Sequence, residues 1–186
     1  MAPPDSPGQS IPSLSLIGSR GSGKSTVGRL LAARLEKKFV DTDSLVMETA
    51  KKNIREIFEL GGEPLFRELE AEAIRHAAAQ SNVVIAAGGG VVLSQINVDI
   101  LKACGPIIWL SASAQVLWQR IAADTTSQTL RPNLTPAGGL PEVQALLARR
   151  TPLYAAAADW QTSGEAEPEQ VVAAILAHFN QRFGKA

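Results

Sequence analysis

A glycine-rich stretch near the N-terminus constrains the fold of this chain more than any other feature. Residues 18–25 read Gly-Ser-Arg-Gly-Ser-Gly-Lys-Ser and fit the pattern G-x-x-x-x-G-K-[ST] at every fixed position. An apolar stretch, residues 13–18, leads into this pattern, and the apolar spacing of an amphipathic helix follows from about Lys24. The sequence therefore predicts a strand, a tight glycine turn and a helix in direct succession, as in a βα unit.

This turn has the chemistry of a phosphate site. Its glycines allow consecutive backbone N–H groups to turn inward around an oxyanion, and the following helix adds its positive N-terminal end. Lys24 can reach the terminal phosphates of a nucleoside triphosphate, and the Ser25 hydroxyl can be a ligand of Mg²⁺. The alternative is a glycine-rich turn that binds nothing. The motif alone predicts only nucleotide binding, because kinases, GTPases, ATPases and inactive binding modules share it.

The rest of the chain alternates short apolar runs with longer amphipathic stretches, which is typical of helices around a parallel sheet. Strands are expected at residues 13–18, 39–41, 83–87, 106–111 and 159–162. Helices are expected from about residue 24, at 54–60, from 64, at 94–104, 112–123 and 141–150, and from 168. Gly61 and Gly62 are expected to end the second of these helices, and Pro64 to open the third. The predicted fold class is α/β, with five strands in one sheet.

Composition narrows the class of protein. The chain has 186 residues, 45% hydrophobic and 19% charged, which excludes a disordered or collagen-like chain. Its 18 basic and 18 acidic residues balance, so neither nucleic acid nor an anionic membrane is expected as the main partner. The single cysteine, Cys104, excludes an intramolecular disulfide, and no apolar run reaches the roughly 18–20 residues of a membrane span. We expect a cytoplasmic monomer with a flexible tail at residues 1–10 and a single domain at 11–184.

One long polar segment, residues 124–140, follows neither the helical nor the strand period. Connections of this length are usually functional lids or disordered segments. We interpret it as a lid, because Arg131 and Pro132 place a charge and a rigid bend in its middle. Plain disorder is the alternative.

Two carboxylates, Asp41 and Asp43, stand where the second expected strand ends. Ligands of open α/β sheets bind beyond the carboxyl ends of the strands. At positions i and i+2 of an extended chain the two carboxylates would point to one side, where one could hold Mg²⁺ and the other a hydroxyl nucleophile. In the alternative interpretation, Asp43 simply caps a helix at residues 44–50.

Three glycines, Gly88, Gly89 and Gly90, close the third expected strand. Residues without side chains allow close approach of the backbone to a ligand, although a flexible turn would have the same composition. Arg67 near a helix start and Arg150 at a helix end could each bind a carboxylate in a two-pronged pair. Taken singly, both are more typical of surface arginines.

Together and in order, these motifs resemble the shikimate kinase family over about residues 11–180. The resemblance rests on the phosphate loop GSRGSGKST, D-T-D, E-I-F, G-E-x-x-F-R-x-x-E, GGG, the R-P of the lid and R-x-P-L-Y. It implies transfer of the γ-phosphoryl group of ATP to the 3-hydroxyl of shikimate, with Mg²⁺, in the pathway to aromatic amino acids. It also implies a three-layer P-loop fold like that of nucleoside kinases, with an acceptor-binding region at about residues 42–75 and a lid at about 124–140.

The resemblance assigns roles to individual residues. The catalytic residues would be Lys24, Asp43 and Arg131, and the ligands of Mg²⁺ would be Ser25 and Asp41. ATP would be bound by Gly21, Ser22, Gly23, Lys24, Ser25, Thr26, Arg120 and Arg131. Shikimate would be bound by Asp43, Phe58, Arg67, Gly88, Gly89, Gly90 and Arg150. Arg120 would lie against the adenine, unless it is an ordinary solvent-facing helix residue.

Two positions depart from the family pattern. Asn133 follows the lid R-P where leucine is frequent, and Ala87 precedes the GGG where threonine is common. Neither position carries a charged role. Two alternatives to the implied function stay open. One is a kinase with another acceptor, either a small hydroxy acid such as gluconate or a nucleotide. The other is a non-catalytic binding module. A module without catalysis would be expected to lack one of the charged residues Lys24, Asp41, Asp43 or Arg131, and all four are present.

Overall fold

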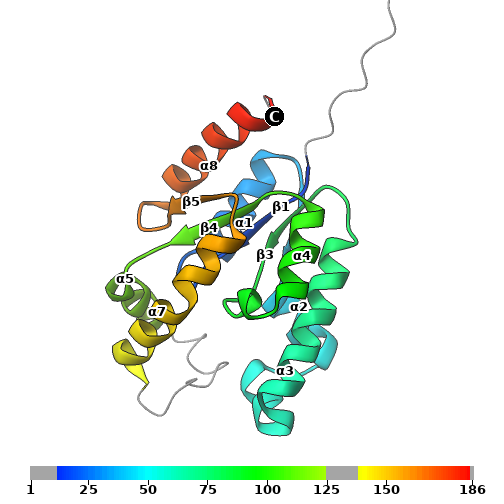
Figure 1. The fold of residues 1–186 in the computed structure, drawn as a ribbon, viewed down its shortest axis with the longest axis vertical. Helices are drawn as coiled ribbons and strands as arrows, with labels where there is room; N and C mark the ends of the chain where they lie inside the picture. The colour runs from blue at the N-terminus through cyan, green and yellow to red at the C-terminus, as the bar shows by residue number, and fades with distance from the viewer. Residues whose placement is uncertain (1–11, 125–137, 185–186) are drawn as a thin grey trace, which may run out of the picture.

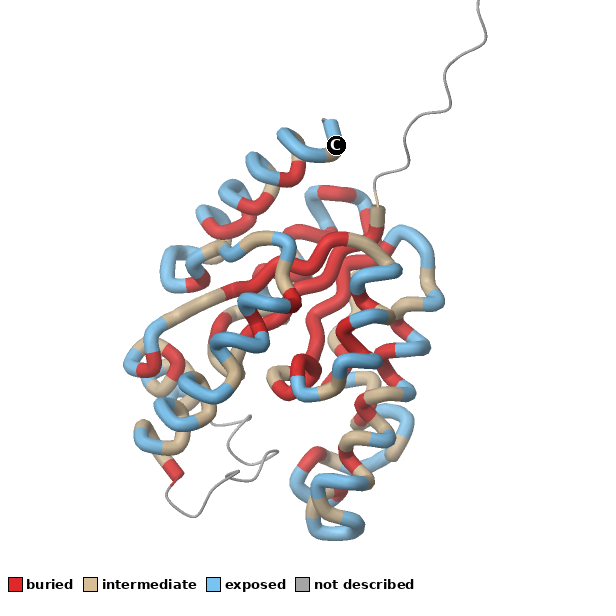
Figure 2. The backbone as a smooth tube through the Cα atoms, in the orientation of Figure 1, coloured by how far each residue is buried: buried red, intermediate tan, exposed pale blue. Residues whose placement is uncertain are grey.

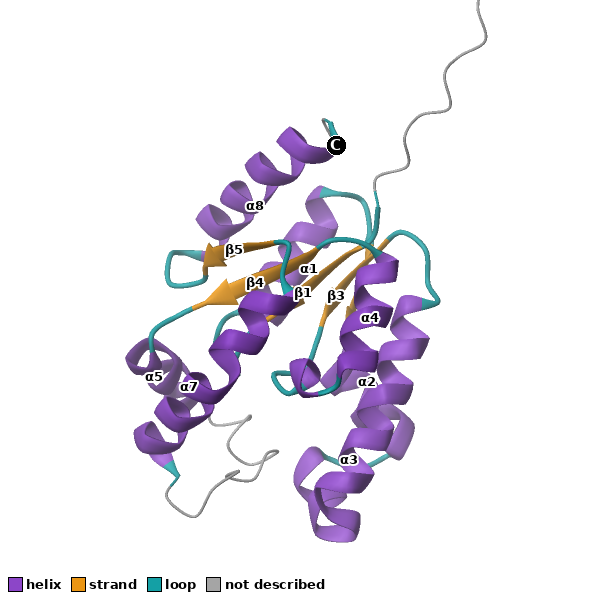
Figure 3. Cartoon of the chain, in the orientation of Figure 1, coloured by secondary structure: helices purple, strands orange, loops and turns teal. Residues whose placement is uncertain are grey.

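Parallel strands form the centre of the molecule. In the computed structural model, which describes residues 12–124 and 138–184, five parallel strands pair in the order β2-β3-β1-β4-β5 (Figures 1 and 3). The strands are β1 (Leu14–Ile17), β2 (Lys38–Asp41), β3 (Val83–Ala86), β4 (Ile107–Ser111) and β5 (Trp160–Ser163). The predicted parallel sheet is confirmed, with each strand end within one residue of its expected position.

The three inner strands, β1, β3 and β4, are buried on both faces, and Figure 2 shows them as the buried centre of the chain. In β3, Val83 and Ile85 enter the core on one face while Val84 enters the core on the other. Trp109 and Leu110 of β4 divide in the same way. Strands with two buried faces are apolar at nearly every position, which explains why they appear in the sequence as continuous apolar runs.

Helices cover the two faces of the sheet, so the predicted three-layer α/β fold is confirmed. The helical elements are α1 (Lys24–Arg34), α2 (Thr42–Ala50), α3 (Ile54–Ala78), η1 (Val91–Leu93), α4 (Gln95–Cys104), α5 (Ala114–Ala123), α7 (Gly139–Ala157) and α8 (Pro168–Phe183). The core on one face involves α1 and α8, and the core on the other involves α3, α4 and α7. A third cluster joins α2 to α3, and α5 packs against α7. No helix in the described parts of the chain is both long and apolar enough to cross a membrane.

The central strand, β1, lies where the topology changes direction. It pairs with β3 on one side and with β4 on the other, while β2 and β5 occupy the two edges. Loops that leave neighbouring strands on opposite sides of such a point diverge and open a crevice at the carboxyl edge of the sheet. The glycine turn of residues 18–23 follows β1 directly, so the fold places it at this crevice.

The predicted break between two helices at residues 61–64 is confirmed. Gly62 has φ 67° and ψ −162°, which interrupts the helical backbone inside α3, and Pro64 lies in the opening turn of the second segment. Asn53 begins the first segment with a capping box, in which it accepts from the Glu56 N–H and the Glu56 carboxylate accepts from the Asn53 N–H. The break allows the first segment to pack on α2 while the second reaches the sheet.

The predicted end of a helix at Arg150 is wrong. Helix α7 continues through Pro152 to Ala157, although a proline inside a helix removes one backbone hydrogen bond. Tyr154 and Ala157 are buried in the core on that face of the sheet. Burial of these two side chains offsets the cost of the proline, which the local sequence pattern does not reveal.

The two carboxylates after β2 are arranged differently from the prediction. The cap of α2 is Asp41, whose Oδ1 accepts from the N–H groups of Asp43 and Ser44 at 3.0 and 3.2 Å, so a capping role for Asp43 is wrong. The extended chain assumed for both carboxylates is also wrong, because α2 begins at Thr42. Asp41 turns the chain from strand to helix by satisfying N–H groups that have no helical partner.

Residues 1–11, 125–137 and 185–186 lie outside the described residues. The expected tail at residues 1–10 and most of the expected lid at 124–140 fall there. Arg131 and Asn133 do so as well, and their roles stay predictions.

Gly105 links α4 to β4 and gives a test of the packing around β1. Its φ is 157°, and a Cβ at this position would overlap the carbonyl oxygen of Ser13, directly before β1. We expect Gly105→Ala to lower the free energy of unfolding by about 2 kcal/mol, or the melting temperature by about 4–8 °C. Thermal unfolding followed by circular dichroism measures this. Gly184→Ala is the control, because Gly184 also has a positive φ but no atom within 4 Å of an added Cβ. Equal losses in both variants would contradict the steric explanation.

Candidate active site

Two adjoining cavities open at the carboxyl edge of the sheet. The first, which we call the loop cavity, lies against residues 20–26 and the ends of β2 and β3. The second, which we call the helix cavity, lies between α3 on one side and α5 and α7 on the other. Among the described residues, Arg20, Asp43 and Ile121 line both cavities. Ligands in the two cavities would therefore meet at these three side chains.

The phosphate loop, residues 18–25, has the backbone that the motif predicts. Gly18, Gly21 and Gly23 have φ values of 144°, 82° and 92°, a region that side-chain-bearing residues rarely adopt. Gly23 is the N-cap of α1, and no side chain caps this helix end. The positive end of α1 is thus directed at the loop cavity, as an anion site requires.

Lys24 extends over the loop rather than into solvent. Its Nζ donates to the carbonyl oxygens of Gly18 and Ser19 at 2.8 and 2.9 Å, and to Ser22 Oγ at 3.4 Å. The ammonium group is therefore held beside the loop backbone, where it can exchange these carbonyls for phosphate oxygens. Ser22 is buried and does not line the loop cavity, whereas Gly21, Gly23, Ser25 and Thr26 do.

Ser25 and Asp41 form an oxygen pair on the wall of the loop cavity. Ser25 Oγ donates to Asp41 Oδ2 at 2.5 Å, so the hydroxyl and the carboxylate already lie together. Mg²⁺ is a hard cation that commonly takes one or two protein oxygens and completes its shell with phosphates and water. No cluster of three or more metal-ligating side chains occurs among the described residues. The pair therefore fits Mg²⁺ bound together with a nucleotide, not an all-protein metal cage.

Asp43 lies at the junction of the two cavities and is 7% exposed. A Cβ on Gly88 would come within 2.6 Å of Asp43 Oδ1, so the carboxylate can occupy this place only because residue 88 is a glycine. Gly88 itself is buried, and its N–H donates to Thr42 Oγ1 at 2.9 Å. Thr42 and Asp43, neighbours in the first turn of α2, thus fix the start of the glycine loop formed by Gly88, Gly89 and Gly90.

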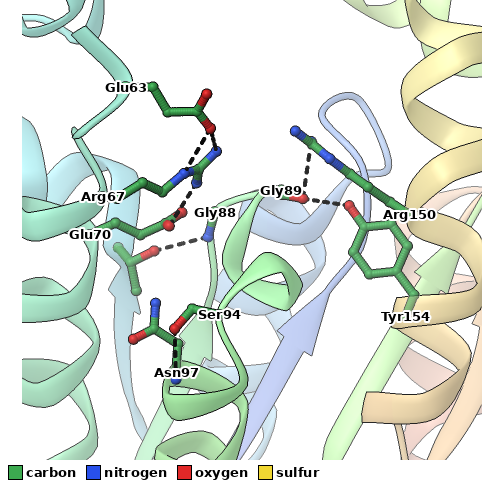
Figure 4. A network of polar contacts seen from close by, with 10 residues as sticks. Glu63, Arg67, Glu70, Gly88, Gly89, Ser94, Asn97, Arg150 and Tyr154 are labelled. Atoms are coloured by element: carbon green, nitrogen blue, oxygen red, sulfur yellow. Dashed lines mark hydrogen bonds and ion pairs between the residues drawn. The ribbon is translucent and has the colours of Figure 1, made fainter. Parts of the chain in front are cut away.

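Arg67 is oriented by two glutamates on its own helix. Its Nε and Nη2 donate to Glu63 Oε1 at 3.1 and 2.9 Å, and its Nη1 donates to Glu70 Oε2 at 2.7 Å (Figure 4). Glu63 is largely exposed, whereas the Glu70 side chain is only 1% exposed. Burial raises the pKa of Glu70, and the charge of Arg67 acts against that rise. The buried pair holds the guanidinium group at the wall of the helix cavity.

Arg150 approaches the glycine loop from α7, on the side away from Arg67 (Figure 4). Its Nη1 donates to the Gly89 carbonyl oxygen at 3.2 Å, and Tyr154 Oη donates to the same oxygen at 2.6 Å. The absence of a side chain at Gly90 leaves room for Arg67, because a Cβ there would overlap the Arg67 guanidinium. Gly89 and Gly90 line the helix cavity together with both arginines, Asp43 and Phe58, so the structure brings six of the seven predicted shikimate-binding residues to one cavity, and only Gly88 is not on its wall.

Apolar side chains form the rest of the helix cavity. Phe58 and Phe66 lie on the α3 side with their ring centroids 5.1 Å apart. Trp118 of α5 and Leu146 of α7 lie on the opposite side. Trp118 was not predicted to line a ligand site, because its helical spacing fits packing between helices equally well. The predicted apolar role of Phe58 is consistent with its position on the cavity wall.

Arg120 is not a solvent-facing helix residue, which was the alternative to a contact with adenine. Its Nη1 donates to the carbonyl oxygens of Gly164 and Gly21 at 2.7 and 3.4 Å, and its Nη2 donates to that of Glu165 at 3.2 Å. The guanidinium group thus ties the loop after β5 to the phosphate loop, on the wall of the loop cavity. Contact with adenine stays a prediction.

Besides Trp118, four polar residues at the site were given no role from the sequence, namely Arg20, Thr42, Glu70 and Tyr154. One of them had a usable signal in the sequence. Glu70 follows Arg67 by three residues, a spacing at which side chains meet on a helix. Tyr154 follows Arg150 by four residues, but the expected helix end at Arg150 concealed this spacing. Thr42 and Arg20 had no such signal, because their roles depend on the meeting of separate loops.

Comparisons with known proteins agree with this geometry. A family model described as shikimate kinase matches residues 20–180. A shikimate kinase from Trichormus variabilis is 42% identical over 165 residues, which is 88% of this chain and 88% of that protein. A solved structure of shikimate kinase from Acinetobacter baumannii in complex with shikimate superposes with a TM-score of 0.80 at 28% identity, covering 91% of this chain and 96% of the other.

The fold by itself is shared more widely. A gluconokinase from Sinorhizobium meliloti superposes with a TM-score of 0.61 at 18% identity, covering 93% of this chain and 94% of the other, and this likeness shows the fold alone. The family model covers residues 20–180, which include the glycine loop, both arginines and the phosphate loop from Arg20 on, and the 42% identity extends over 88% of the chain. The chain belongs to the shikimate kinase family.

Proposed function

We propose that this protein transfers the γ-phosphoryl group of ATP to the 3-hydroxyl of shikimate, which gives shikimate 3-phosphate and ADP. The observation that carries this proposal is the junction of the loop cavity and the helix cavity at Asp43. A nucleotide on the phosphate loop and a small hydroxy acid between the helices would present their reacting groups to each other at this carboxylate. The family membership supports the same pair of substrates.

The acceptor would be held by its carboxylate and its ring. Arg67 and Arg150 line one cavity and can each form a two-pronged pair with a carboxylate. Glu63 occupies one edge of Arg67, but this glutamate is largely exposed, and exposed ion pairs contribute about 0–1 kcal/mol. A substrate carboxylate can therefore replace it at little cost. Phe58 and Trp118 would cover the ring from the two sides of the cavity.

Asp43 would position the hydroxyl group that attacks the γ-phosphorus. The hydroxyl oxygen forms the new bond to phosphorus while the bond to the oxygen between the β- and γ-phosphorus atoms breaks, and ADP leaves. Asp43 accepts the hydroxyl proton late in this step, since the transition state is loose and the hydroxyl is only weakly acidic. Its near-complete burial keeps water from competing for the same carboxylate.

Charge on the moving group would be neutralised from the loop cavity. Lys24, already held beside the loop carbonyls, would bind the terminal phosphates. Mg²⁺ held by Ser25 and Asp41 would neutralise phosphate charge when bound. Arg131 would add a further positive charge from the lid, two of whose described residues, Asp124 and Gly139, line the loop cavity and the helix cavity respectively. Positioning and charge supply most of the rate in this class of reaction.

Substrate choice is tested first with a panel of acceptors. Purified protein with Mg·ATP should release ADP rapidly with shikimate and only slowly with gluconate, quinate or AMP, because the helix cavity offers two arginines and a small apolar wall. A coupled ADP-release assay measures this. Faster turnover with gluconate or AMP would contradict shikimate as the substrate but would still show kinase activity. No turnover with any acceptor would favour a binding module without catalysis.

Lys24→Met tests the phosphate loop. The substitution removes a charge that counts more in the transition state than in the ground state, so kcat should fall about 10²–10³-fold. Melting temperature should change little, because Lys24 is only half-buried and its bonds to Gly18, Ser19 and Ser22 lie within the phosphate loop. Steady-state kinetics and thermal unfolding measure both effects. A variant with nearly normal kcat would show that this lysine does not stabilise the transferring group.

Arg150→Ala tests the acceptor side. Shikimate affinity should fall at least tenfold, since a charge-assisted bond to the substrate carboxylate is lost. Calorimetric titration of shikimate measures this.

Arg150 is preferable to Arg67 for this test, because removal of Arg67 would leave the buried Glu70 without its partner and destabilise the fold. Arg34→Ala is the control, because Arg34 pairs with Glu169 on the surface and lines neither cavity. Equal affinity in the Arg150 variant and the control would remove Arg150 from the site.

A further inference from the structure

One buried side chain at the site contacts neither cavity. Tyr154 is fully buried and is absent from the walls of the loop cavity and the helix cavity. Its hydroxyl nevertheless ends at the glycine loop, where it donates to the Gly89 carbonyl oxygen at 2.6 Å (Figure 4). A hydroxyl in this position cannot contact a substrate, but its hydrogen bond can fix the position of the glycine loop, which faces the substrate.

Gly89 is the point at which the glycine loop meets the phosphate loop. A Cβ on Gly89 would lie 3.4 Å from both the backbone nitrogen of Arg20 and the carbonyl oxygen of Gly18. The two backbones are therefore close enough that a single methyl group at this residue would bridge them. A bond that fixes Gly89 also fixes the distance between the acceptor side and the donor side of the site.

The Tyr154 ring is itself firmly placed. It stacks on Trp109 of β4, with ring centroids 5.7 Å apart. Burial raises the pKa of the Tyr154 phenol, while Ser19 and Arg150 lower it less, so the hydroxyl remains a hydrogen-bond donor at neutral pH. The sheet, the phosphate loop and α7 thus converge on one phenol.

Arg150 shares the same acceptor atom, at 3.2 Å from the Gly89 oxygen. If Arg150 binds the substrate carboxylate, as in the proposed function on which this step rests, its bond to Gly89 weakens when substrate arrives. The stronger bond from Tyr154 remains. The two donors lie four residues apart on α7 and so face the same way, which requires the helix to continue past Pro152.

We propose that Tyr154 is a positioning residue that holds the glycine loop against the phosphate loop while Arg150 is engaged by the acceptor. It acts through Gly89 and contacts no substrate. Its loss should misplace the acceptor relative to the nucleotide without altering the nucleotide site. The effect should therefore appear in the parameters for shikimate and not in the affinity for ATP.

Tyr154→Phe is the test, because phenylalanine keeps the ring that stacks on Trp109 and removes only the hydroxyl. We expect kcat/KM for shikimate to fall about tenfold, the size expected for one lost buried hydrogen bond. The dissociation constant for ATP should stay within twofold of the wild-type value. Thr151→Val is the matched control, since Thr151 on the same helix also donates a hydroxyl to a carbonyl, that of Leu147 at 2.8 Å, but is exposed.

A second measurement needs no substrate. Hydrogen exchange of the backbone amides in residues 88–93 should be faster in ligand-free Tyr154→Phe than in the wild type and in Thr151→Val. Unchanged exchange together with unchanged kcat/KM would overturn the proposal. A fall in ATP affinity equal to the fall for shikimate would also overturn it, because it would indicate a general loss of structure. If the wild type fails to phosphorylate shikimate, the proposed function fails, and the exchange experiment still decides the role of Tyr154.

Discussion

Backbone-to-backbone contact around the phosphate loop is the constraint on which the rest of the site depends. Two glycines from separate parts of the chain make it possible. A Cβ on Gly18 would overlap the Leu110 carbonyl of β4, and one on Gly164 would lie 2.6 Å from the Ser22 carbonyl. The loops after β1 and β5 can therefore pack this closely only where side chains are missing, and Gly89 in the loop after β3 lies next to the backbone of residues 18 and 20.

Next to these backbone contacts, an ion pair fixes the position of the charged side chains on the acceptor side. Glu70 is almost fully buried, and its burial would be unfavourable without the Arg67 guanidinium at 2.7 Å. The ion pair holds the Arg67 guanidinium in one orientation, in which it can donate to the carboxylate of the acceptor. Asp43 belongs to the same group of contacts, because its carboxylate and that of Glu70 both lie beside Gly88. These contacts place Arg67 and Asp43 at the cavity wall before any ligand binds, so the substrate has less to order on this side.

Local patterns in the sequence were sufficient for the elements and for the phosphate loop. The three inner strands are mostly apolar runs, and the turn after β1 is defined by residues 18–25 alone. Prediction failed where tertiary contacts decide between local options. Asp41 and Asp43 are both acceptable helix caps by type, and the end of β2 selects Asp41. Pro152 predicts a helix end, and only the burial of Tyr154 explains why α7 continues. Trp118 faces a cavity that exists only when α3 and α5 are placed together.

The two halves of the site differ in what they are made of, and this difference limits what a motif can reveal. The donor side is formed by backbone groups, one lysine and a helix end, so its pattern identifies a bound phosphate and is compatible with many acceptors. The acceptor side is formed by side chains from α2, α3, α5 and α7, which lie far apart in the sequence. Substitutions there can change the acceptor and leave the phosphate loop and the sheet intact. A fold shared with kinases of other small molecules is the expected result, and the acceptor must be identified from Arg67, Arg150 and the walls between them.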